Sequence, residues 1–569
     1  MPTILFHLPQ TYTSMTSRKR FKRDVTLFES LPNELFVDVF SYLSDVDAVY
    51  AFSRLNKRFQ HLILNYCYTF DFKSVNKTKF TYVIQQHDIH RWQSLRLSDD
   101  NNTPGQVTYF CQLFSFTENI SQLKALSIIN IKPNTVSLFL SNLTSFTHLV
   151  SLSIGSVCGK TIPFLELPTL KNLVINSCMH SSWMKNLELK SLQHTIEHHC
   201  NHEHNLTWPI TLKRLRVYFR RTGDSELVRV SLKDLSQLTY LSIFDTAWES
   251  PAPDGQIWEK LITSSMPLLE NFKFYFKFWR DFNLTSDMNR IISTFSTPFY
   301  LQEKSWFIQC DANRHQFSIA ILYSLPFAFE YFEIVTHSFD DSISTLNTCS
   351  SDDLKKNLYK NVKKLAVNVK CEKINKTLVS VNISDLTLKF FDSSMDWIFS
   401  MTHLCQLSLG HQFNMSSTDF ICLLKNTPYL HSLIVPYRIL KLLTNEWKNK
   451  VVCELLSRKI RSLEICSDGC FLMNIHDYVK VDELLPIVRV CSQRCRNLNI
   501  TVYSRNIVVG LILRSMRHLR SLKVCLQEHN VDLKITKEWL VEQDITLKNL
   551  DCCIVENGNE YSFWFGRRQ

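Results

Sequence analysis

The chain has 569 residues, of which 45% are hydrophobic and 21% charged, a composition typical of folded protein without a large disordered part. Its 64 basic and 53 acidic residues give a formal charge of +11, which by itself does not imply nucleic-acid binding. No apolar run reaches the ~18 residues that a membrane-spanning helix needs. The sequence therefore predicts no membrane span, and its length predicts several domains or one extended array.

The N-terminal residues lack the pattern of a secretory signal. No basic region precedes the short apolar run of Met1–Tyr12, and His7 and Pro9 interrupt that run. We therefore expect a cytoplasmic or nuclear protein whose 18 cysteines stay reduced. Arg18–Arg23, RKRFKR, is either a nuclear localisation signal or part of a disordered basic tail, which we place at residues 1–26.

Three short helices are predicted within residues 27–70. Leu31-Pro32 suits a helix start, and Glu34 puts a negative charge in the first turn. An apolar stripe of helical period follows, formed by Leu35, Phe36, Val39, Phe40 and Leu43. Ser44 with Asp47 resembles a capping box that starts a second helix. A third helix carries apolar residues at the same spacing, namely Leu55, Phe59, Leu62, Ile63 and Tyr66.

So small a helical unit carries more apolar residues than its own core needs. Units below about 40 residues usually require disulfides, a metal or a partner for stability. Neither a disulfide pair nor a metal motif is evident in this segment. The surplus apolar side chains therefore favour a docking surface for another protein. The alternative is that these helices simply cap the next domain.

This segment resembles an F-box. The family pattern begins Leu-Pro-x-Glu, continues with apolar residues at helical spacing and Asp-Leu in the second helix, and ends in Val-Asn/Cys-Lys/Arg-x-Trp/Phe. The matching positions are Leu31, Pro32, Glu34, Leu35, Val39, Phe40, Leu43, Asp47, Leu55, Asn56, Lys57, Arg58 and Phe59. Leu55 replaces Val, and Ala48 stands where the family prefers Leu. Because Ala48 removes contact area, we expect it to weaken docking.

F-box domains bind the Skp adaptor of Skp–cullin–F-box ubiquitin ligases, and through it a cullin scaffold. The resemblance implies that the adaptor-binding residues are Leu31, Pro32, Glu34, Leu35, Val39, Phe40, Leu43, Leu55 and Phe59.

After a connector at residues 71–88, one phrase recurs along the chain: apolar-x-x-apolar-x-apolar. Its fifteen copies include WQSLRL at 92–97, LVSLSI at 149–154 and LRSLKV at 519–524. The steps between clear neighbours run from 21 to about 35 residues, which matches leucine-rich repeats of roughly 20–29 residues with insertions. Each copy predicts a strand with alternate side chains inward, and neighbouring repeats must stack to bury that face.

The array resembles degenerate leucine-rich repeats. The family places Asn or Cys three positions after the last leucine; Cys178 fits, whereas Asp100 and Gln412 do not. The predicted fold is a small all-α F-box followed, over residues 89–569, by an α/β leucine-rich-repeat solenoid with a curved parallel sheet and irregular repeats. The alternative is an unrelated α/β fold with repeated strands.

Basic and aromatic side chains alternate with apolar ones in neighbouring strands of this predicted sheet. The candidate substrate-binding residues are Arg214, Arg216, Tyr218, Arg220, Phe244, Lys273, Tyr275 and Lys277. Arginine and aromatic residues are common interface anchors, and such a surface suits an acidic or phosphorylated peptide. The alternative is an ordinary solvated sheet face.

No catalytic arrangement and no cofactor site is predicted. Gly155–Thr161, GSVCGKT, is one residue short of a phosphate loop, and Pro163 and Pro168 follow where a helix must start. His198–His204, with Cys200, is rich in zinc ligands but lies in an insertion and lacks a C-x-x-C pair, so zinc binding stays open. No Ser–His–Asp or Cys–His arrangement can be selected from the sequence.

The predicted function is that of a non-catalytic substrate adaptor of a Skp–cullin–F-box ubiquitin ligase, whose repeats bind a protein substrate without a cofactor. One alternative is an F-box scaffold without a ligase role. The other is a repeat protein that uses the basic surface to bind nucleic acid.

Overall fold

In the computed structural model, the described residues are 28–114, 120, 122–130, 146–155, 167, 169–176, 209, 211–219, 229, 232–248, 252–279, 284–312, 319–335, 342–348, 357–368, 378, 382–392, 395–466, 479–502, 511–526, 534–544 and 547–566. Several predicted features lie outside them: Arg18–Arg23, the loop after Gly155, Cys178, His198–His204 and Arg220.

The N-terminal unit consists of the three expected helices. After the 3-10 turn η1 (Phe28–Ser30) come α1 (Asn33–Ser41), α2 (Asp45–Phe52) and α3 (Lys57–Tyr66). Pro32 is the N-cap of α1, while the side chains of Ser44 and Asn56 accept hydrogen bonds from the backbone at the starts of α2 and α3. Because these caps satisfy amide groups that have no partner within a helix, they set the helix starts close to the predicted positions.

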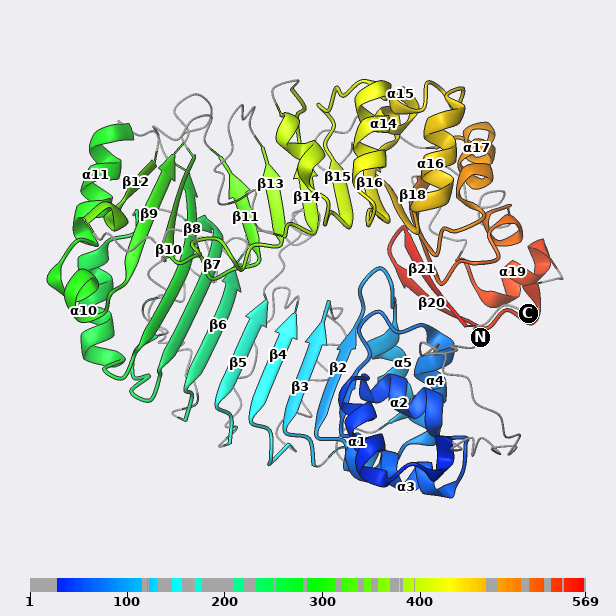
Figure 1. Ribbon diagram of the computed structural model, residues 1–569, viewed down its shortest axis with the longest axis horizontal. Coiled ribbons are helices and arrows are strands. Elements are labelled where there is room, and N and C mark those ends of the chain that lie inside the picture. The colour runs from blue at the N-terminus through cyan, green and yellow to red at the C-terminus, as the bar shows by residue number, and fades with distance from the viewer. Residues whose placement is uncertain are drawn as a thin grey trace, which may run out of the picture.

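Two sheets follow the helices in one continuous solenoid (Figure 1). Among the described residues, the first sheet has eleven strands in the order β1-β2-β3-β4-β5-β6-β7-β8-β10-β9-β12. Their bounds are β1 (Thr69–Asp71), β2 (Ser94–Ser98), β3 (Ala125–Ile129), β4 (Ser151–Gly155), β5 (Asn172–Asn176), β6 (Arg214–Phe219), β7 (Tyr240–Trp248), β8 (Asn271–Trp279), β9 (Phe307–Ala312), β10 (Ile319–Leu325) and β12 (Ser342–Ser344).

The second sheet has ten described strands, in the order β11-β13-β14-β15-β16-β17-β18-β19-β21-β20. Their bounds are β11 (Tyr331–Ile334), β13 (Lys364–Val367), β14 (Asp385–Leu388), β15 (Gln406–Leu409), β16 (Ser432–Pro436), β17 (Ser462–Cys466), β18 (Asn497–Val502), β19 (Ser521–Leu526), β20 (Cys552–Asn557) and β21 (Glu560–Phe565).

The recurring phrase sets the strand register. Its central apolar residue pairs with the same position of the next copy, giving the row Leu95, Leu126, Leu152, Leu173, Leu215, Leu241 and Phe272. The second sheet has an equivalent row: Phe332, Leu365, Leu386, Leu407, Leu433, Leu463, Leu498 and Leu522. All of these side chains are buried, so stacking of the repeats supplies the core that one repeat lacks.

Described helices lie outside parts of both sheets, with α10 and α11 beside β7–β9 and α14–α17 beside β15–β18 (Figure 1). Their bounds are α4 (Lys77–Gln86), η2 (Ile89–Arg91), α5 (Gln106–Leu113), α10 (Gly255–Ser265), α11 (Leu284–Thr294), the π-helix η4 (Phe299–Glu303), η6 (Thr345–Thr348), η7 (Asp396–Ser400), α14 (Ser417–Asn426), α15 (Tyr437–Leu443), α16 (Lys450–Lys459), α17 (Val481–Cys491) and α19 (Lys537–Gln543). The ring of Trp258 in α10 lies 5.1 Å from that of Phe272 and 6.0 Å from that of Phe276. Phe272 and Phe276 of β8 therefore face outward, towards α10. The strand positions that alternate with them form the inner face.

The curved sheet is not one uninterrupted parallel ladder. β10 runs antiparallel to both β8 and β9, and β12 runs antiparallel to β9. After β10 the chain enters the second sheet at β11, returns to the first sheet for β12 and then continues in the second sheet from β13. The second sheet ends in the antiparallel hairpin β20–β21, in which β21 pairs with β19. Both sheets are otherwise parallel, so the predicted solenoid is present but is divided near its middle.

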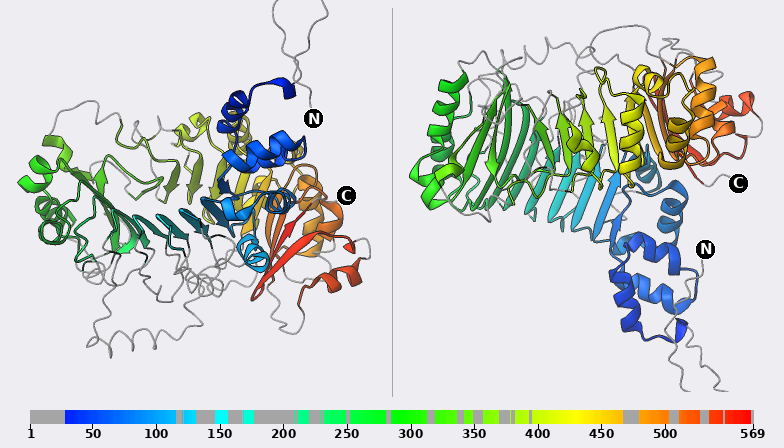
Figure 2. Two further views of the ribbon diagram at one scale, coloured as in Figure 1. Left: turned by 90° about the horizontal axis from the view of Figure 1, so that it is seen from below. Right: turned by 45° about the horizontal axis from the view of Figure 1, so that its top comes forward.

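The two ends of the solenoid meet, and the N-terminal helices stand out from one side of the resulting ring (Figures 1 and 2). Lys77 of α4 forms an ion pair with Asp551, and the rings of Phe80 and Trp564 are 5.4 Å apart. Gly105 has a positive φ of 79°, and a Cβ at this position would collide with the side chain of Val555. The first and last parts of the chain therefore share one closing interface.

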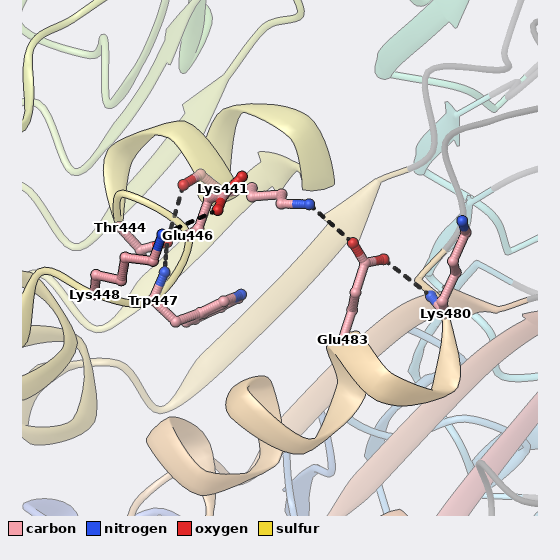
Figure 3. Close-up of polar contacts among 7 residues, drawn as sticks. All are labelled: Lys441, Thr444, Glu446, Trp447, Lys448, Lys480 and Glu483. Atoms are coloured by element: carbon pink, nitrogen blue, oxygen red, sulfur yellow. Dashed lines mark hydrogen bonds and ion pairs between the residues drawn. The ribbon is translucent and has the colours of Figure 1, made fainter.

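A left-handed turn joins α15 to α16 (Figure 3). Asn445, Glu446 and Trp447 have φ values of 48°, 53° and 68°, a conformation that costs roughly 1–2 kcal/mol per residue for residues other than glycine. Thr444 supports the turn, because its hydroxyl accepts from the Trp447 amide at 3.2 Å and donates to the Leu440 carbonyl at 2.8 Å. An ion pair of 3.0 Å between Lys441 and Glu483 ties α15 to α17.

We expect Glu446→Gly to raise the free energy of unfolding by about 0.5–1 kcal/mol, because glycine adopts a positive φ without strain. The Glu446–Lys448 ion pair that it removes is exposed and contributes little. The measurement is the thermal unfolding midpoint. Glu454→Gly in the exposed middle of α16 is the matched control, and it should lower stability by about 1 kcal/mol. Equal destabilisation by both changes would contradict strain at Glu446.

Candidate adaptor-docking and substrate-binding surfaces

The strand pairing brings most of the predicted substrate-binding residues together. Arg216, Ser242 and Lys273 occupy one inner-face row across β6, β7 and β8. Tyr218, Phe244 and Tyr275 form the next row. The predicted surface therefore exists as a set of neighbouring side chains, although burial divides its members into two groups.

The aromatic row is covered by the chain itself. Phe244 stacks on Tyr275 with ring centroids 4.4 Å apart and planes 9° apart. Phe329, in the segment that crosses from β10 to β11, lies 5.0 Å from Phe244 and 6.2 Å from Tyr218. Tyr275 is fully buried and Phe244 is 8% exposed. These two aromatic residues therefore belong to the core that joins the two sheets, whereas Tyr218 stays half-buried at its edge.

Lys277 is also engaged within the fold. Its ammonium group lies 2.7 Å from the Glu333 carboxylate on β11, and the two side chains are 12% and 6% exposed. Asn368 donates a further hydrogen bond to the same carboxylate. A buried ion pair of this kind specifies which segments meet, so Lys277 fastens the crossing segment and its charge is neutralised.

Arg214 and Arg216 both lie close to the ring of one tyrosine. The Arg214 guanidinium is 4.7 Å from the ring centre of Tyr240, and that of Arg216 is 5.2 Å from it. Arg216 also donates a hydrogen bond of 3.2 Å to the Tyr240 hydroxyl. These contacts hold both guanidinium groups against the Tyr240 ring on the inner face without pairing them with a carboxylate.

Lys273 is half-buried beside Ser242, and burial lowers the pKa of its ammonium group. No acidic residue of the described chain forms an ion pair with Lys273, Arg214 or Arg216. What remains of the predicted surface is thus a compact cationic site, defined by Arg214, Arg216, Lys273 and Tyr240. Tyr240 was not among the residues predicted from the sequence. Its position directly before the L-x-L of its repeat was the available signal.

The part of the chain that the structure describes contains neither a candidate metal site nor a candidate membrane-spanning helix. There, no three or more His, Cys, Asp or Glu side chains are grouped as metal ligands. No described helix has the length and apolar character that crossing a bilayer requires.

A second surface lies on α1 of the N-terminal unit. Four large apolar side chains of α1 and of the two residues after its last turn remain solvent-exposed: Leu35 at 46%, Val39 at 37%, Leu43 at 37% and Tyr42 at 89%. Their spacing of four, seven and eight residues from Leu35 is that of a single helical stripe. Pro32 and Glu34 are exposed beside it, and Leu55 is 48% exposed.

Residues 28–71 match the family model of the F-box domain. No curated protein matches the chain. The match covers the three helices and ends at β1, the first strand of the solenoid. The chain thus consists of an F-box domain followed by long, mostly parallel α/β sheets.

Two of the predicted adaptor-binding residues lie inside the F-box domain. Phe59 is fully buried and Phe40 is 5% exposed. Phe59 packs edge-on against Phe36 at 4.6 Å, and Phe40 lies 5.3 Å from Phe52. Phe40 and Phe59 therefore build the core beneath α1, and they support the surface that their exposed neighbours form.

Ala48 is also fully buried, so the expectation that it removes area from the docking surface has to be corrected. Its small side chain affects packing within the F-box domain. Helical periodicity places Ala48 on the same face of α2 as other apolar residues, but it does not say whether that face looks inward.

Arg58 is a positioning residue that sequence reasoning did not include among the site residues. Its guanidinium donates hydrogen bonds to the carbonyls of Glu29 and Leu31, each at 2.5 Å, and to the Asn33 side chain at 2.7 Å. It therefore holds the start of α1, next to the exposed stripe. The sequence contained a signal for this role, because Arg58 lies in the Asn56–Phe59 part of the F-box pattern.

The F-box domain is attached to the solenoid through several polar contacts. Asp47 forms an ion pair with Lys79 of α4, and the Ser53 and Tyr82 hydroxyl groups are 2.7 Å apart. The Thr69 amide donates to Asp45 at 2.5 Å. α4 occupies much of the segment 71–88 that was expected to be a connector. These contacts involve α2 and Ser53, and the stripe of α1 remains exposed.

Proposed function

We propose that this chain is a non-catalytic substrate adaptor of a Skp–cullin–F-box ubiquitin ligase. The F-box domain binds the Skp adaptor, and the solenoid, which we assign to the leucine-rich-repeat type, holds a protein substrate. The observation that carries this proposal is the exposed apolar stripe of α1 within a matched F-box domain.

The burial pattern supports a docking role over a capping role. The core of the F-box domain contains the buried side chains of Phe36, Phe40 and Phe59, whereas each residue of the stripe is at least 37% exposed. The solenoid contacts the α2 region through α4 and β1, and Leu35, Val39 and Leu43 remain exposed in the described structure. Clustered exposed apolar side chains on a small unit are typical of a protein-binding surface.

The division of labour follows from where the two surfaces lie. We assign residues 27–70 to the F-box domain, which ends within β1, the strand that begins the first sheet of the solenoid. The exposed stripe is on the unit that stands out from the ring, whereas the cationic site is on the inner face of β6–β8 (Figure 2). A substrate held at the inner face would leave α1 accessible, so one chain can bind both partners.

The test is co-expression of the full chain with the Skp adaptor and purification through a tag on the adaptor. We expect the wild type to co-purify, and we expect Leu31→Ala with Pro32→Ala to weaken binding about tenfold, because both side chains border the stripe. Binding is measured by titration calorimetry on the purified proteins.

Two outcomes separate this proposal from its alternatives. No complex with the wild type would overturn adaptor binding. A complex that recruits the cullin scaffold but supports no ubiquitin transfer to captured cellular proteins would favour a scaffold without a ligase role.

A further inference from the structure

The inner face of β2–β8 carries five basic side chains among its described residues, and their electrostatic environments differ. Arg96 lies 3.1 Å from Asp71, and Lys277 is paired with Glu333. Arg214, Arg216 and Lys273 have no carboxylate partner in the described structure. Uncompensated positive charge is therefore confined to β6 and β8.

Among these basic side chains, Lys273 is the one whose charged form is disfavoured by burial. Its side chain is half-buried next to Ser242, which is 3% exposed, and desolvation disfavours its charged form. A desolvated ammonium group gains when an anion approaches, because the lost hydration is replaced by an ion pair.

The row Arg216–Ser242–Lys273 has a spacing that suits one anionic group. The two cations are separated by two strand spacings, roughly 9–10 Å between backbones. Both side chains are long enough to converge above Ser242 on one carboxylate or phosphate. Tyr240 orients Arg216 from the neighbouring row, which reduces the entropy lost on binding.

We infer that Arg216 and Lys273, flanked by Arg214, bind an anionic side chain of a protein substrate, a carboxylate or a phosphate monoester. This inference rests on the proposed function in one respect, namely that the solenoid binds a protein. It adds the chemical class of the recognised residue and the side chains that recognise it.

The surroundings favour a peptide over a nucleic acid. A nucleic-acid strand needs a track of cations along its phosphates. The inner-face positions in register on β3, β4 and β5 are Ser127, Ser153 and Val174, which carry no charge. The cationic site is instead bordered by half-buried Tyr218 and Tyr331, which suit the apolar neighbours of one charged residue in an extended peptide.

The experiment uses the full chain and three fluorescein-labelled peptides of alternating serine and glycine. The first peptide is unmodified, the second carries phosphoserine in place of serine, and the third carries glutamate in place of serine. Fluorescence anisotropy is measured at low and at physiological ionic strength. We expect the phosphoserine or the glutamate peptide to bind and the unmodified peptide not to bind. The stronger of the two identifies the anionic group.

Arg216→Glu with Lys273→Glu should weaken that binding at least about tenfold, because two charge-assisted contacts become repulsive. Lys425→Glu, exposed on α14, is the matched control and should leave the dissociation constant unchanged. If the double variant fails to fold, Lys273→Met replaces it. Because Lys273→Met removes a desolvated charge, it should raise the thermal midpoint and weaken peptide binding at the same time. A lysine with a purely structural role would not give these two opposite effects.

Unchanged peptide binding in these variants would overturn the inference. Single-stranded DNA is tested as a competing ligand. If it binds more tightly than either anionic peptide, and the double variant loses this binding, the ligand of the site is a nucleic acid and not a peptide. Adaptor binding is measured on the same proteins and should be retained in every variant. A failure of adaptor binding in the wild type would therefore reject the proposed function without touching the result for the peptides.

Discussion

Leu35→Asp with Val39→Asp is expected to abolish binding of the Skp adaptor. Each side chain is one-third to one-half exposed and belongs to the part of the stripe that lies on α1 itself. Burying one such aliphatic side chain in an interface contributes about 1.5–3 kcal/mol, and a buried unpaired carboxylate adds a penalty. The dissociation constant should therefore rise on the order of 100-fold or more, measured by calorimetry with the purified adaptor.

The control for this double variant is Leu268→Asp, which makes the same chemical change at a 51% exposed leucine between α10 and β8. It should bind the adaptor as the wild type does. Circular dichroism and the thermal midpoint show whether the α1 variant remains folded, as its exposed positions predict. Retained adaptor binding by a folded Leu35→Asp, Val39→Asp protein would be fatal to the docking surface assigned to α1.

Trp564→Ala is expected to lower the free energy of unfolding by about 3–5 kcal/mol, because it empties a fully buried aromatic site. Its indole belongs to β21 yet packs on Phe80 of α4 and Tyr109 of α5, with ring centroids 5.4 and 6.5 Å away. The loss should therefore also speed hydrogen exchange in α4 and α5. The thermal midpoint and amide exchange by mass spectrometry measure the two effects.

Phe563→Ala provides the matched control, since Phe563 is equally buried in the same hairpin but belongs to the core of the second sheet. It should destabilise the protein to a similar degree while exchange in α4 and α5 changes less. If Trp564→Ala accelerates exchange only within β20 and β21, the closing interface contributes little energy, and the ring would then be held by the solenoid alone.

Much of the fold could be predicted from short-range pattern. The apolar-x-x-apolar-x-apolar phrase marks the parallel strands, and its central leucine is the residue that pairs from strand to strand, as Leu95 with Leu126 shows. Period-two alternation also separated the inner from the outer face correctly at Arg216 and Lys273. These features follow from local geometry, because a strand points alternate side chains to opposite faces.

Other assignments needed contacts that no local pattern contains. Phe244 and Tyr275 have the right alternation for an open surface, but the segment around Phe329, far along the chain, covers them. Phe40 has the same helical periodicity as Val39 and Leu43, yet it points into the core. A period defines a face, and only the neighbouring elements decide what covers that face.

Local sequence pattern was enough to predict the three N-terminal helices, the F-box pattern, the repeat that produces the solenoid and the presence of a basic inner face. Each of these depends on residue type and spacing over a few positions. Three features became visible only in the folded chain: the closure of the ring through Lys77 and Asp551, the division into two sheets, and the charges that lack a partner. The physical reason is that these features depend on pairs of groups distant in sequence, such as Lys277 with Glu333, whose meeting is fixed only when the whole chain is folded.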